Sequence, residues 1–396
     1  MPIPAGRWCA MALMNLAVVL PAFAQPNQEV TIPLQAPSSA SAISQNFLSV
    51  TFVSAPTLPF PNPTDSNSPA FWDGDAFYIF NSIDGQPRRA EGSSLADALD
   101  TNPGGSSSSY DDNMGSGRWL EAVIRDDGTG LLYGWYHNEI PTACPQGVLL
   151  WPQIGAVVSE DDGYTWEDLG LILTPRDGTV SCDTQHPMTD GGIGDFSVIL
   201  DHNTDTGDHY VYFIFSSYGG SLAEQGISFA RMLWIDRDQP LDPVSGESRA
   251  VKWNGESWIA PGIGGMSIAI FHDDAQVSWT SINNNGFWGP SVHWNSDRNR
   301  FIVLMSRSIG GNYVSGGIYM TYTKTLDEPL SWVQPKLIDS TNQGWYPQVI
   351  GDPSVQGTDK LSGSQARYFN QGQSNSYIVF TDSANSPDRA RATKRN

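Results

Sequence analysis

Short apolar runs separated by polar turns recur along most of this chain, and their period predicts β-strands rather than helices. Five of these runs open in a similar way, at residues 67–71, 119–123, 194–201, 288–292 and 345–349. A turn rich in Asp, Asn and Gly and then a second apolar strand follow the first four. A longer polar connection follows the fifth. Five like openings predict one supersecondary unit that is used five times.

Five copies of a three- or four-stranded antiparallel unit predict an all-β, five-bladed β-propeller over residues 46–382. A β-sandwich is the alternative, but it would not need the repeated openings. A leading strand is expected at residues 47–53, and it would complete the last repeat if the array closes into a ring. Only the short stretch 93–99 has a helical pattern.

Residues 159–166 match the pattern S-x-D-x-G-x-T-W, which is the Asp-box. Asp161 can accept backbone N–H bonds across the turn, Gly163 permits an unusual φ angle, and Trp166 can pack beneath. We therefore expect a structural turn between outer strands of the second blade, not a catalytic motif.

Residues 1–24 have the pattern of a secretory signal peptide. Arg7 supplies a positive start, residues 10–20 an apolar core, and residues 22–24 a small-x-small site that predicts cleavage after Ala24. We expect a secreted or periplasmic protein with a flexible lead-in over 25–45 and a charged tail over 383–396. No other apolar run approaches the roughly 20 residues of a membrane-spanning helix, so no membrane insertion is expected.

Composition narrows the class of ligand. The chain has 21 basic and 42 acidic residues, and losing Arg7 with the leader would leave 20 against 42, a net charge of −22. Such a surface repels nucleic acid and anionic lipid, so neutral ligands suit it better. Two cysteines remain, Cys144 and Cys182, and a disulfide is the preferred interpretation for an oxidising compartment. Two separate buried thiols are the alternative. The sequence does not define an oligomeric state.

In a propeller the equivalent positions of the repeats converge on one axis, so the exceptional residue in each copy is a functional candidate. Antiparallel pairing also brings the end of each second strand beside the start of its first. The predicted rim of one mouth therefore holds Asn67, Glu121, His137, Glu139, Asp195, Tyr218, Trp288, Arg307 and Trp345.

Residues 288–292, Trp-Gly-Pro-Ser-Val, resemble the W-A-P-x-V of arabinanases. With the blade openings over about residues 60–380, the chain resembles the arabinanase, xylosidase and invertase-like superfamily of five-bladed propeller glycoside hydrolases. Residues 133–139 and 194–198 also resemble an uncharacterised bacterial secreted group of that shape. The resemblance implies hydrolysis of a carbohydrate. The chain departs from the arabinanase pattern at 67–69 and at Ser291, where that type carries acids, so its three-acid set does not carry over.

Glycoside hydrolysis needs two carboxyl groups across the scissile bond, one of them protonated near neutral pH. Glu121, beside Trp119 and within reach of Trp135, suits the general acid, and Asp195 suits the base or nucleophile. Glu139 is a third catalytic candidate. The structural alternative is that the buried acids accept backbone N–H bonds at the narrow end of a blade.

The remaining rim residues form the predicted substrate-binding set. His137, with Glu139, could orient substrate or shift a pKa, or the two could simply close a strand end. Trp288 and Trp345 could stack on sugar rings or pack between blades. Arg307 suits a hydrogen bond to a rim acid, and Asn67 and Tyr218 complete the set. A loop carrying His186 and Asp190 could approach the mouth.

Three functions follow from these patterns. The first is a hydrolase of a neutral glycan, and the second is a non-catalytic propeller that binds carbohydrate or protein. The third, a sialidase, needs an arginine cluster for which only Arg118, Arg231 and Arg307 are available. Nucleotide-binding loops, the zinc motif H-E-x-x-H and a nucleophile elbow are missing from the sequence. No cofactor is expected. Calcium is compatible with so acidic a chain, but no EF-hand-like loop supports it.

Overall fold

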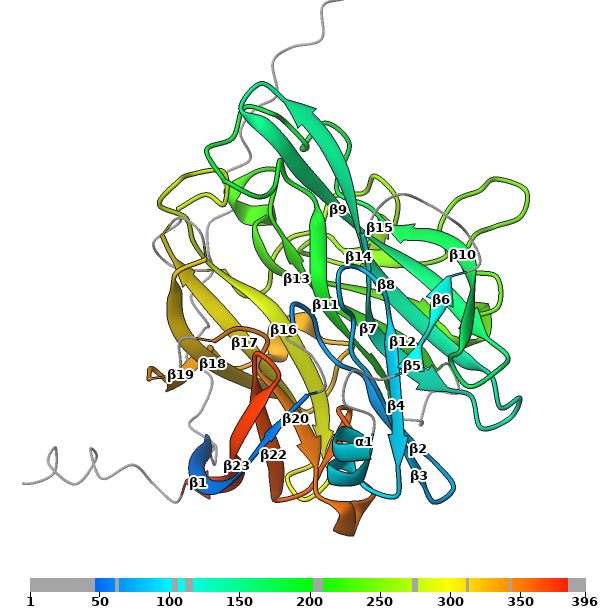
Figure 1. The fold of residues 1–396 in the computed structure, drawn as a ribbon. Coiled ribbons are helices and arrows are strands. Elements are labelled where there is room, and N and C mark those ends of the chain that lie inside the picture. Colours follow the sequence, from blue (N-terminus) through cyan, green and yellow to red (C-terminus); the bar gives the residue numbers. More distant parts are fainter. Residues whose placement is uncertain are drawn as a thin grey trace, which may run out of the picture. The chain divides into compact units, whose positions relative to one another are not determined.

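The computed structural model describes residues 47–60, 64–101, 106–110, 117–201, 209–272, 277–310, 313–341 and 344–383. They form five mainly antiparallel sheets of four or five strands (Figure 1). Within these ranges, no helix has the length and apolar character that crossing a membrane requires.

The first blade runs outward from its inner strand as β2 (Ala70–Asp73), β3 (Ala76–Phe80), β4 (Arg88–Gly92) and β5 (Ser106–Ser107), with α1 (Leu95–Thr101) after β4. The second contains β7 (Gly117–Arg125), β8 (Leu132–Cys144), β9 (Gly147–Ser159) and β10 (Thr165–Leu173), edged by β6 (Ser109–Tyr110). The third contains β11 (Ile193–Leu200), β12 (Tyr210–Ser217), β13 (Gly226–Leu233), β14 (Val251–Trp253) and β15 (Trp258–Pro261).

The fourth blade contains β16 (Asn285–Asn295), β17 (Arg300–Ile309), β18 (Ser315–Thr323) and β19 (Lys336–Asp339), with β21 (Leu361–Ser362) beside β16. The fifth contains β20 (Gln348–Gly351), β22 (Gln365–Asn370), β23 (Gln373–Ser383) and β1 (Phe47–Pro59). Short 3-10 turns lie at Leu222–Glu224, Trp234–Asp236, Pro329–Ser331 and Pro353–Val355.

The expected closing strand is present. β1 pairs antiparallel with β23, and Phe47 lies opposite Ser383, so a segment before the first blade forms the outer strand of the fifth. An unpaired sheet edge can pair with another chain. Here a strand from the beginning of the fold completes the last sheet, and this pairing closes the ring through hydrogen bonds.

Five hydrophobic cores lie between neighbouring blades because alternate side chains of each strand point to opposite faces of its sheet. On β12, for example, Phe213 packs toward the second blade with Trp135, whereas Tyr212 packs toward the fourth with Val303. A core between the fifth and first blades, which includes Phe369 and Phe77, completes the circle. The other two cores join the fourth blade to the fifth and the first to the second.

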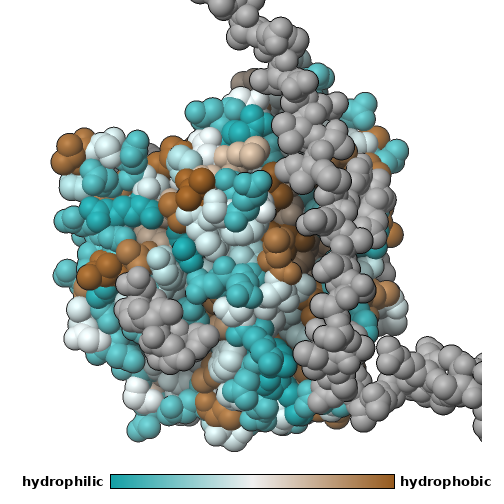
Figure 2. All heavy atoms as spheres, turned by 180° about the vertical axis from the view of Figure 1, so that it is seen from behind, coloured by the Kyte–Doolittle hydropathy of each residue, from teal (hydrophilic) through white to brown (hydrophobic). Residues whose placement is uncertain are grey.

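On the face shown in Figure 2, hydrophobic side chains are scattered among hydrophilic ones.

The five sheets confirm the sequence-based prediction of a five-bladed β-propeller. The expected helix forms at Leu95–Thr101, slightly later than 93–99.

The turn at residues 159–166 joins β9 to β10 on the outer side of the second blade. The Asp161 carboxylate accepts bonds from the backbone N and the Oγ1 of Thr165, each at 2.8 Å. Gly163 has a φ of +81°, which favours glycine. Trp166 is fully buried and donates its indole N–H to Ser108 Oγ at 2.9 Å. The turn thus fastens the outer edge of this blade.

The predicted disulfide is also present, between Cys144 at the tip of the β8–β9 hairpin and Cys182. The predicted signal peptide, the lead-in and nearly all of the charged tail lie outside the described residues. Ser383, assigned to the tail, is the last residue of β23.

Candidate active site

The inner strands of three blades each carry an irregularity at their opening. The pairing register shifts at Glu121 in β7, at Asp195 in β11 and between Trp288 and Ser291 in β16. An extra residue in one strand turns its side chain out of the regular alternation, and such bulges are frequent next to active sites. The equivalent positions of the third, fourth and fifth blades have positive φ: Asp195 at 43°, Gly289 at 56° and Tyr346 at 50°. The repeat therefore aims its opening residues at the axis.

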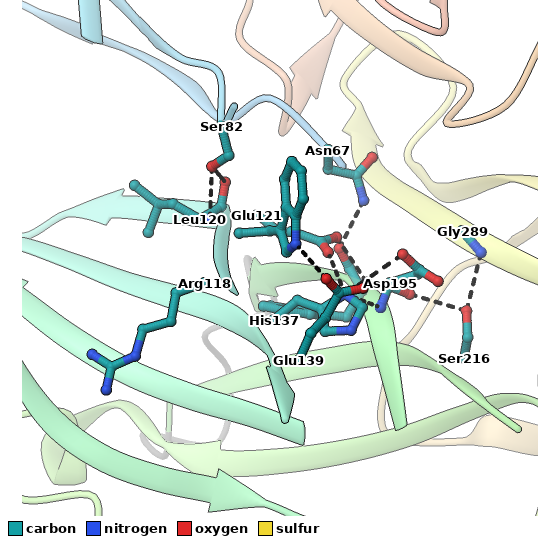
Figure 3. Close-up of polar contacts among 12 residues, drawn as sticks. Asn67, Ser82, Arg118, Leu120, Glu121, His137, Glu139, Asp195, Ser216 and Gly289 are labelled. Carbon is teal, nitrogen blue, oxygen red and sulfur yellow. Dashed lines mark hydrogen bonds and ion pairs between the residues drawn. The ribbon is translucent and has the colours of Figure 1, made fainter. Parts of the chain in front are cut away.

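Asp195 is the centre of the resulting group (Figure 3). Tyr346 donates its hydroxyl to Oδ1 at 2.7 Å, and Tyr218 donates to Oδ2. Burial alone would raise the pKa of Asp195, but the hydrogen bond and charge of His137 and the two tyrosine hydroxyls outweigh it and lower the pKa below 3.8. Asp195 is therefore an ionised carboxylate at neutral pH.

Glu121 and His137 lie beside it. His137 Nδ1 is 3.3 Å from Glu121 Oε1 and 3.6 Å from Asp195 Oδ1. Burial opposes a charged imidazole, yet the bonds to Asp195 and Glu121 raise the pKa of His137 well above 6.5. Burial raises the pKa of Glu121 to about 7. The predicted pairing of β7 with β8 is thus confirmed: it brings the His137 side chain to Glu121.

Glu121 also ties two blades together. Its Oε2 accepts the backbone N–H of Phe196 at 2.9 Å, and its side chain is fully buried. Neutral side chains hold neighbouring openings in the same way. Ser82 accepts from Leu120 N, Ser216 accepts from Gly289 N, and Gln348 accepts from Ser68 N. Glu121 therefore performs a structural task that other blade junctions assign to Ser or Gln.

Two further acids lie closer to solvent. Glu139 is half-buried, and its Oε2 accepts the indole N–H of Trp119 at 2.9 Å. Asp65 precedes the first blade and is exposed, yet protein surrounds much of its carboxyl group. That burial, with the charges of Asp195 and Glu139, raises the pKa of Asp65 to about 6. A solvent-facing acid with a raised pKa thus lies within electrostatic reach of an ionised one.

An aromatic cluster forms the wall beside Asp195 on the side of the third, fourth and fifth blades. Its buried members are Tyr218, Trp279, Trp288 and Tyr346, and Tyr313 and Trp345 are partly buried. Trp288 is covered by neighbours, with the Tyr313 ring centroid at 4.6 Å and that of Tyr346 at 5.4 Å. Trp288 therefore packs between blades, which is the alternative to stacking on a sugar, whereas Trp345 is only partly buried.

The β8–β9 hairpin extends past the other strands, at the top of Figure 1. Residues 174–192 pack along it through Leu150, which bonds to Met188 O and Asp190 N, and the disulfide fixes its tip. This loop brings His186 against Tyr313, with ring centroids 5.2 Å apart, so the loop does reach the aromatic wall.

Two predicted binding residues have structural partners. Asn67 is buried, and its Nδ2 donates to Phe196 O at 2.7 Å and to Pro290 O at 2.8 Å, so it links three blades across the axis. Arg307 donates to Asn285 Oδ1 and to the Tyr319 hydroxyl, each at 3.0 Å, and neither of these partners is a rim acid.

Glu121, His137 and Asp195 each offer one donor atom, and these atoms lie within 4.8 Å of one another. A metal ion would need these donors for itself, but they already pair with one another and with Tyr218 and Tyr346. Calcium takes six to eight oxygen ligands, whereas this trio includes an imidazole whose raised pKa favours its protonated form. The residues therefore do not fit a calcium ion.

The sequence-based prediction missed Asp65 and Tyr346. Asp65 stands two positions before Asn67, so a comparison of repeats that starts at Asn67 leaves it out. Tyr346 lies inside the opening Trp345-Tyr346-Pro347, where the repeated tryptophan is the more conspicuous residue. Placing Tyr346 opposite Asp195 and Gly289 in the repeat would have shown that it occupies the axial position.

Comparisons with known proteins concern the fold. No family model and no curated protein matches the sequence. An arabinanase of Bacillus subtilis shares 12% identity, covers 82% of this chain and 96% of its own, and has a TM-score of 0.40. The catalytic domain of the GH62 α-L-arabinofuranosidase of Coprinopsis cinerea shares 12% identity, covers 85% of this chain and 99% of its own, and has a TM-score of 0.45. An exo-β-1,3-galactanase of Phanerochaete chrysosporium shares 11% over 83% of this chain and 64% of its own, with a TM-score of 0.45. The chain is a five-bladed β-propeller by its own sheets, and these solved glycoside hydrolases are what it is similar to.

Proposed function

We propose that this chain is a secreted or periplasmic glycoside hydrolase that cleaves a neutral glycan with carboxyl groups at the mouth of the propeller. One observation carries the proposal. The Asp195 carboxylate is held at the axis by Tyr218, Tyr346 and His137, within electrostatic reach of the solvent-facing acid Asp65. The acidic composition supports a neutral ligand, because it disfavours anionic ones.

In the proposed mechanism, Asp195 is the base or nucleophile and Asp65 is the general acid. Environments that push two carboxyl pKa values apart assign acid and base roles, because one group keeps its proton while the other stays ionised. The pKa of Asp65 is raised to about 6 and that of Asp195 is lowered. Asp65 would protonate the leaving oxygen, and Asp195 would activate water or attack the anomeric carbon.

Glu121, expected from sequence to be the general acid, has a different part in this proposal. It is fully buried, and its oxygens already contact His137 and the Phe196 N–H. We assign it the positioning of His137 and, through it, of Asp195. Glu139 sets the charge around Asp65. Trp345, which is partly buried, offers its remaining aromatic surface to a sugar ring.

The test is hydrolysis of a panel of neutral polysaccharides by the parent chain and by single variants. General acid–base catalysis contributes about 10²- to 10⁴-fold, so Asp65→Asn and Asp195→Asn should each lower kcat by that range. Asp75→Asn, an exposed acid of the β2–β3 turn, is the matched control and should leave kcat unchanged. Full activity of Asp195→Asn would overturn the mechanism.

A second candidate is a propeller that binds carbohydrate without cleaving it. The observation in its favour is that Glu121 replaces the Ser and Gln ties of other blades, and both Asp195 oxygens already have hydroxyl partners. Binding of a neutral glycan that the parent chain leaves intact after prolonged incubation would favour this candidate over the first.

A sialidase has less support. Arg118, Arg231 and Arg307 lie in three different sheets, and Arg118 points away from the acids in Figure 3. We also infer that the turn at 159–166 is an Asp-box with a structural role, supported by its Asp161 bonds. Export is supported by the disulfide, since such bonds persist in oxidising compartments.

A further inference from the structure

An uncharged cavity of about 390 Å³ lies on the fifth blade, within the range of about 300–1,000 Å³ common for ligand pockets. Its lining consists of Thr57, Gly344, Asn370, Gln371, Gln373, Ser374 and Asn375. Four of these side chains are amides, and none carries a charge, although the chain has 63 basic and acidic residues. Such a lining suits a ligand that is rich in hydroxyl groups and uncharged.

One amide of this cavity lacks a partner for its oxygen. Asn370 is about 4% exposed, and no described residue bonds to its Oδ1. Its Nδ2 contacts the Tyr368 hydroxyl at 3.4 Å. A buried polar atom without a bond is costly, but this oxygen is itself closed off from solvent, so the amides that a ligand can reach are the exposed ones, Gln371, Gln373 and Asn375.

The cavity adjoins the mouth at two points. Gln371 donates its backbone N–H to Trp345 O at 2.6 Å, and the next residue, Tyr346, bonds to Asp195. On the other side, a methyl group built on Gly372 would lie 2.3 Å from Thr64 Oγ1, and Asp65 directly follows Thr64. The β22–β23 turn is therefore wedged between Trp345–Tyr346, which bonds to Asp195, and the segment that carries Asp65.

The turn itself holds an unusual residue. Gln371 and Gly372 have φ of 50° and 70°, the type I′ conformation in which Asn-Gly is preferred to Gln-Gly. A non-glycine residue in a left-handed conformation is often found at functional sites. Here the conformation places the exposed Gln371 side chain at the cavity.

We infer that this cavity is a distal subsite that binds an uncharged sugar unit of a glycan chain extending from the mouth over the fifth blade. The inference rests on the proposed function, since it assigns the direction of the same substrate. It commits the substrate to an oligosaccharide or polysaccharide rather than a single sugar. Hydroxyl groups of the distal unit would bond to the amides, and Trp345 would lie along the path.

The test measures binding by titration calorimetry. Its probes are neutral arabinan, xylan and galactan oligosaccharides of two to six units, with oligogalacturonides as the anionic comparison. At least one neutral series should bind more tightly as its length grows, and oligogalacturonides should not bind. Gln371→Gly and Gln373→Ala should each weaken the longest member about three- to tenfold, the worth of one or two neutral hydrogen bonds. The shortest members should bind as before.

A matched control is Asn299→Gly, which relieves the same backbone conformation (φ of 49°) in the β16–β17 turn, outside the cavity lining. It should change no affinity. The inference is overturned if no neutral series binds, or if the cavity variants bind the longest member as the parent does. Length-dependent binding that is lost in those variants without any hydrolysis would sustain the subsite and reject the hydrolase. Hydrolysis whose substrate affinity does not depend on oligosaccharide length would support the hydrolase and reject the subsite.

Discussion

Replacing Tyr346 with Phe tests the electrostatics around Asp195. The substitution removes a 2.7 Å hydrogen bond to a buried carboxylate and keeps the ring in the aromatic wall. A bond to a charged group is worth about 1.5–3 kcal/mol. One pKa unit corresponds to 1.36 kcal/mol, so the pKa of Asp195 should rise by roughly one to two units. The bond from Tyr218 remains and limits the change.

Urea unfolding at several pH values measures the effect without requiring a substrate. The folded-state pKa of Asp195 is below 3.8, so its stabilising contribution is present above 3.8 and is lost as pH falls through the folded value. Tyr346→Phe should therefore cost about 1.5–3 kcal/mol at pH 7 and clearly less near pH 3. Tyr322→Phe removes a 3.0 Å bond from Leu48 N and should cost the same at both pH values. A cost of Tyr346→Phe that is larger near pH 3 than at pH 7 would refute an ionised, tyrosine-held Asp195.

Three other outcomes are expected. In Gly194→Ala, the new methyl group would lie 2.5 Å from His137 Nε2 and should displace the imidazole. The free energy of unfolding should fall by about 1–3 kcal/mol, and kcat on any cleaved glycan should also fall. Unchanged stability and kcat would contradict this packing. Replacing Cys144 and Cys182 with Ser opens a loop of 38 residues and should lower the free energy of unfolding by up to about 4 kcal/mol, and an unshifted urea midpoint would contradict this. Burial lowers the pKa of Lys252 to about 7 from 10.5, so parent stability should rise between those pH values, and Lys252→Met should show a smaller rise.

The fold was predictable because its signals are local and repeated. The opening at 194–201 and its four relatives have the strand period and turn residues of hairpins, and hairpin pairing follows from turn position. The short first opening at 67–71 was the weakest of the five, and it still forms the start of the first blade. What the sequence could not supply is the register shift at Asp195, since a bulge leaves no fixed pattern in a single sequence.

The site was predictable only where pairing decides proximity. His137 reaches Glu121 because Trp119 lies opposite His137 in the hairpin, and that register follows from the turn. Proximity between blades depends on how the ring closes, which no local pattern determines. Tyr346 and Asp195 are 151 positions apart. Burial raises the pKa of Glu121, whereas the bonds from His137, Tyr218 and Tyr346 lower that of Asp195, and both environments appear only when the sheets meet.

The β1–β23 pairing has a mechanical consequence. Because Phe47 lies opposite Ser383, tension applied at these two points pulls on the same end of the ladder. The hydrogen bonds would then break one pair after another, as a zipper opens, rather than all at once in shear. A processive unfolding motor that pulls on the chain before Phe47 or after Ser383 would detach the outer strand of the fifth blade first. Only a few hydrogen bonds would resist the pulling force at any moment.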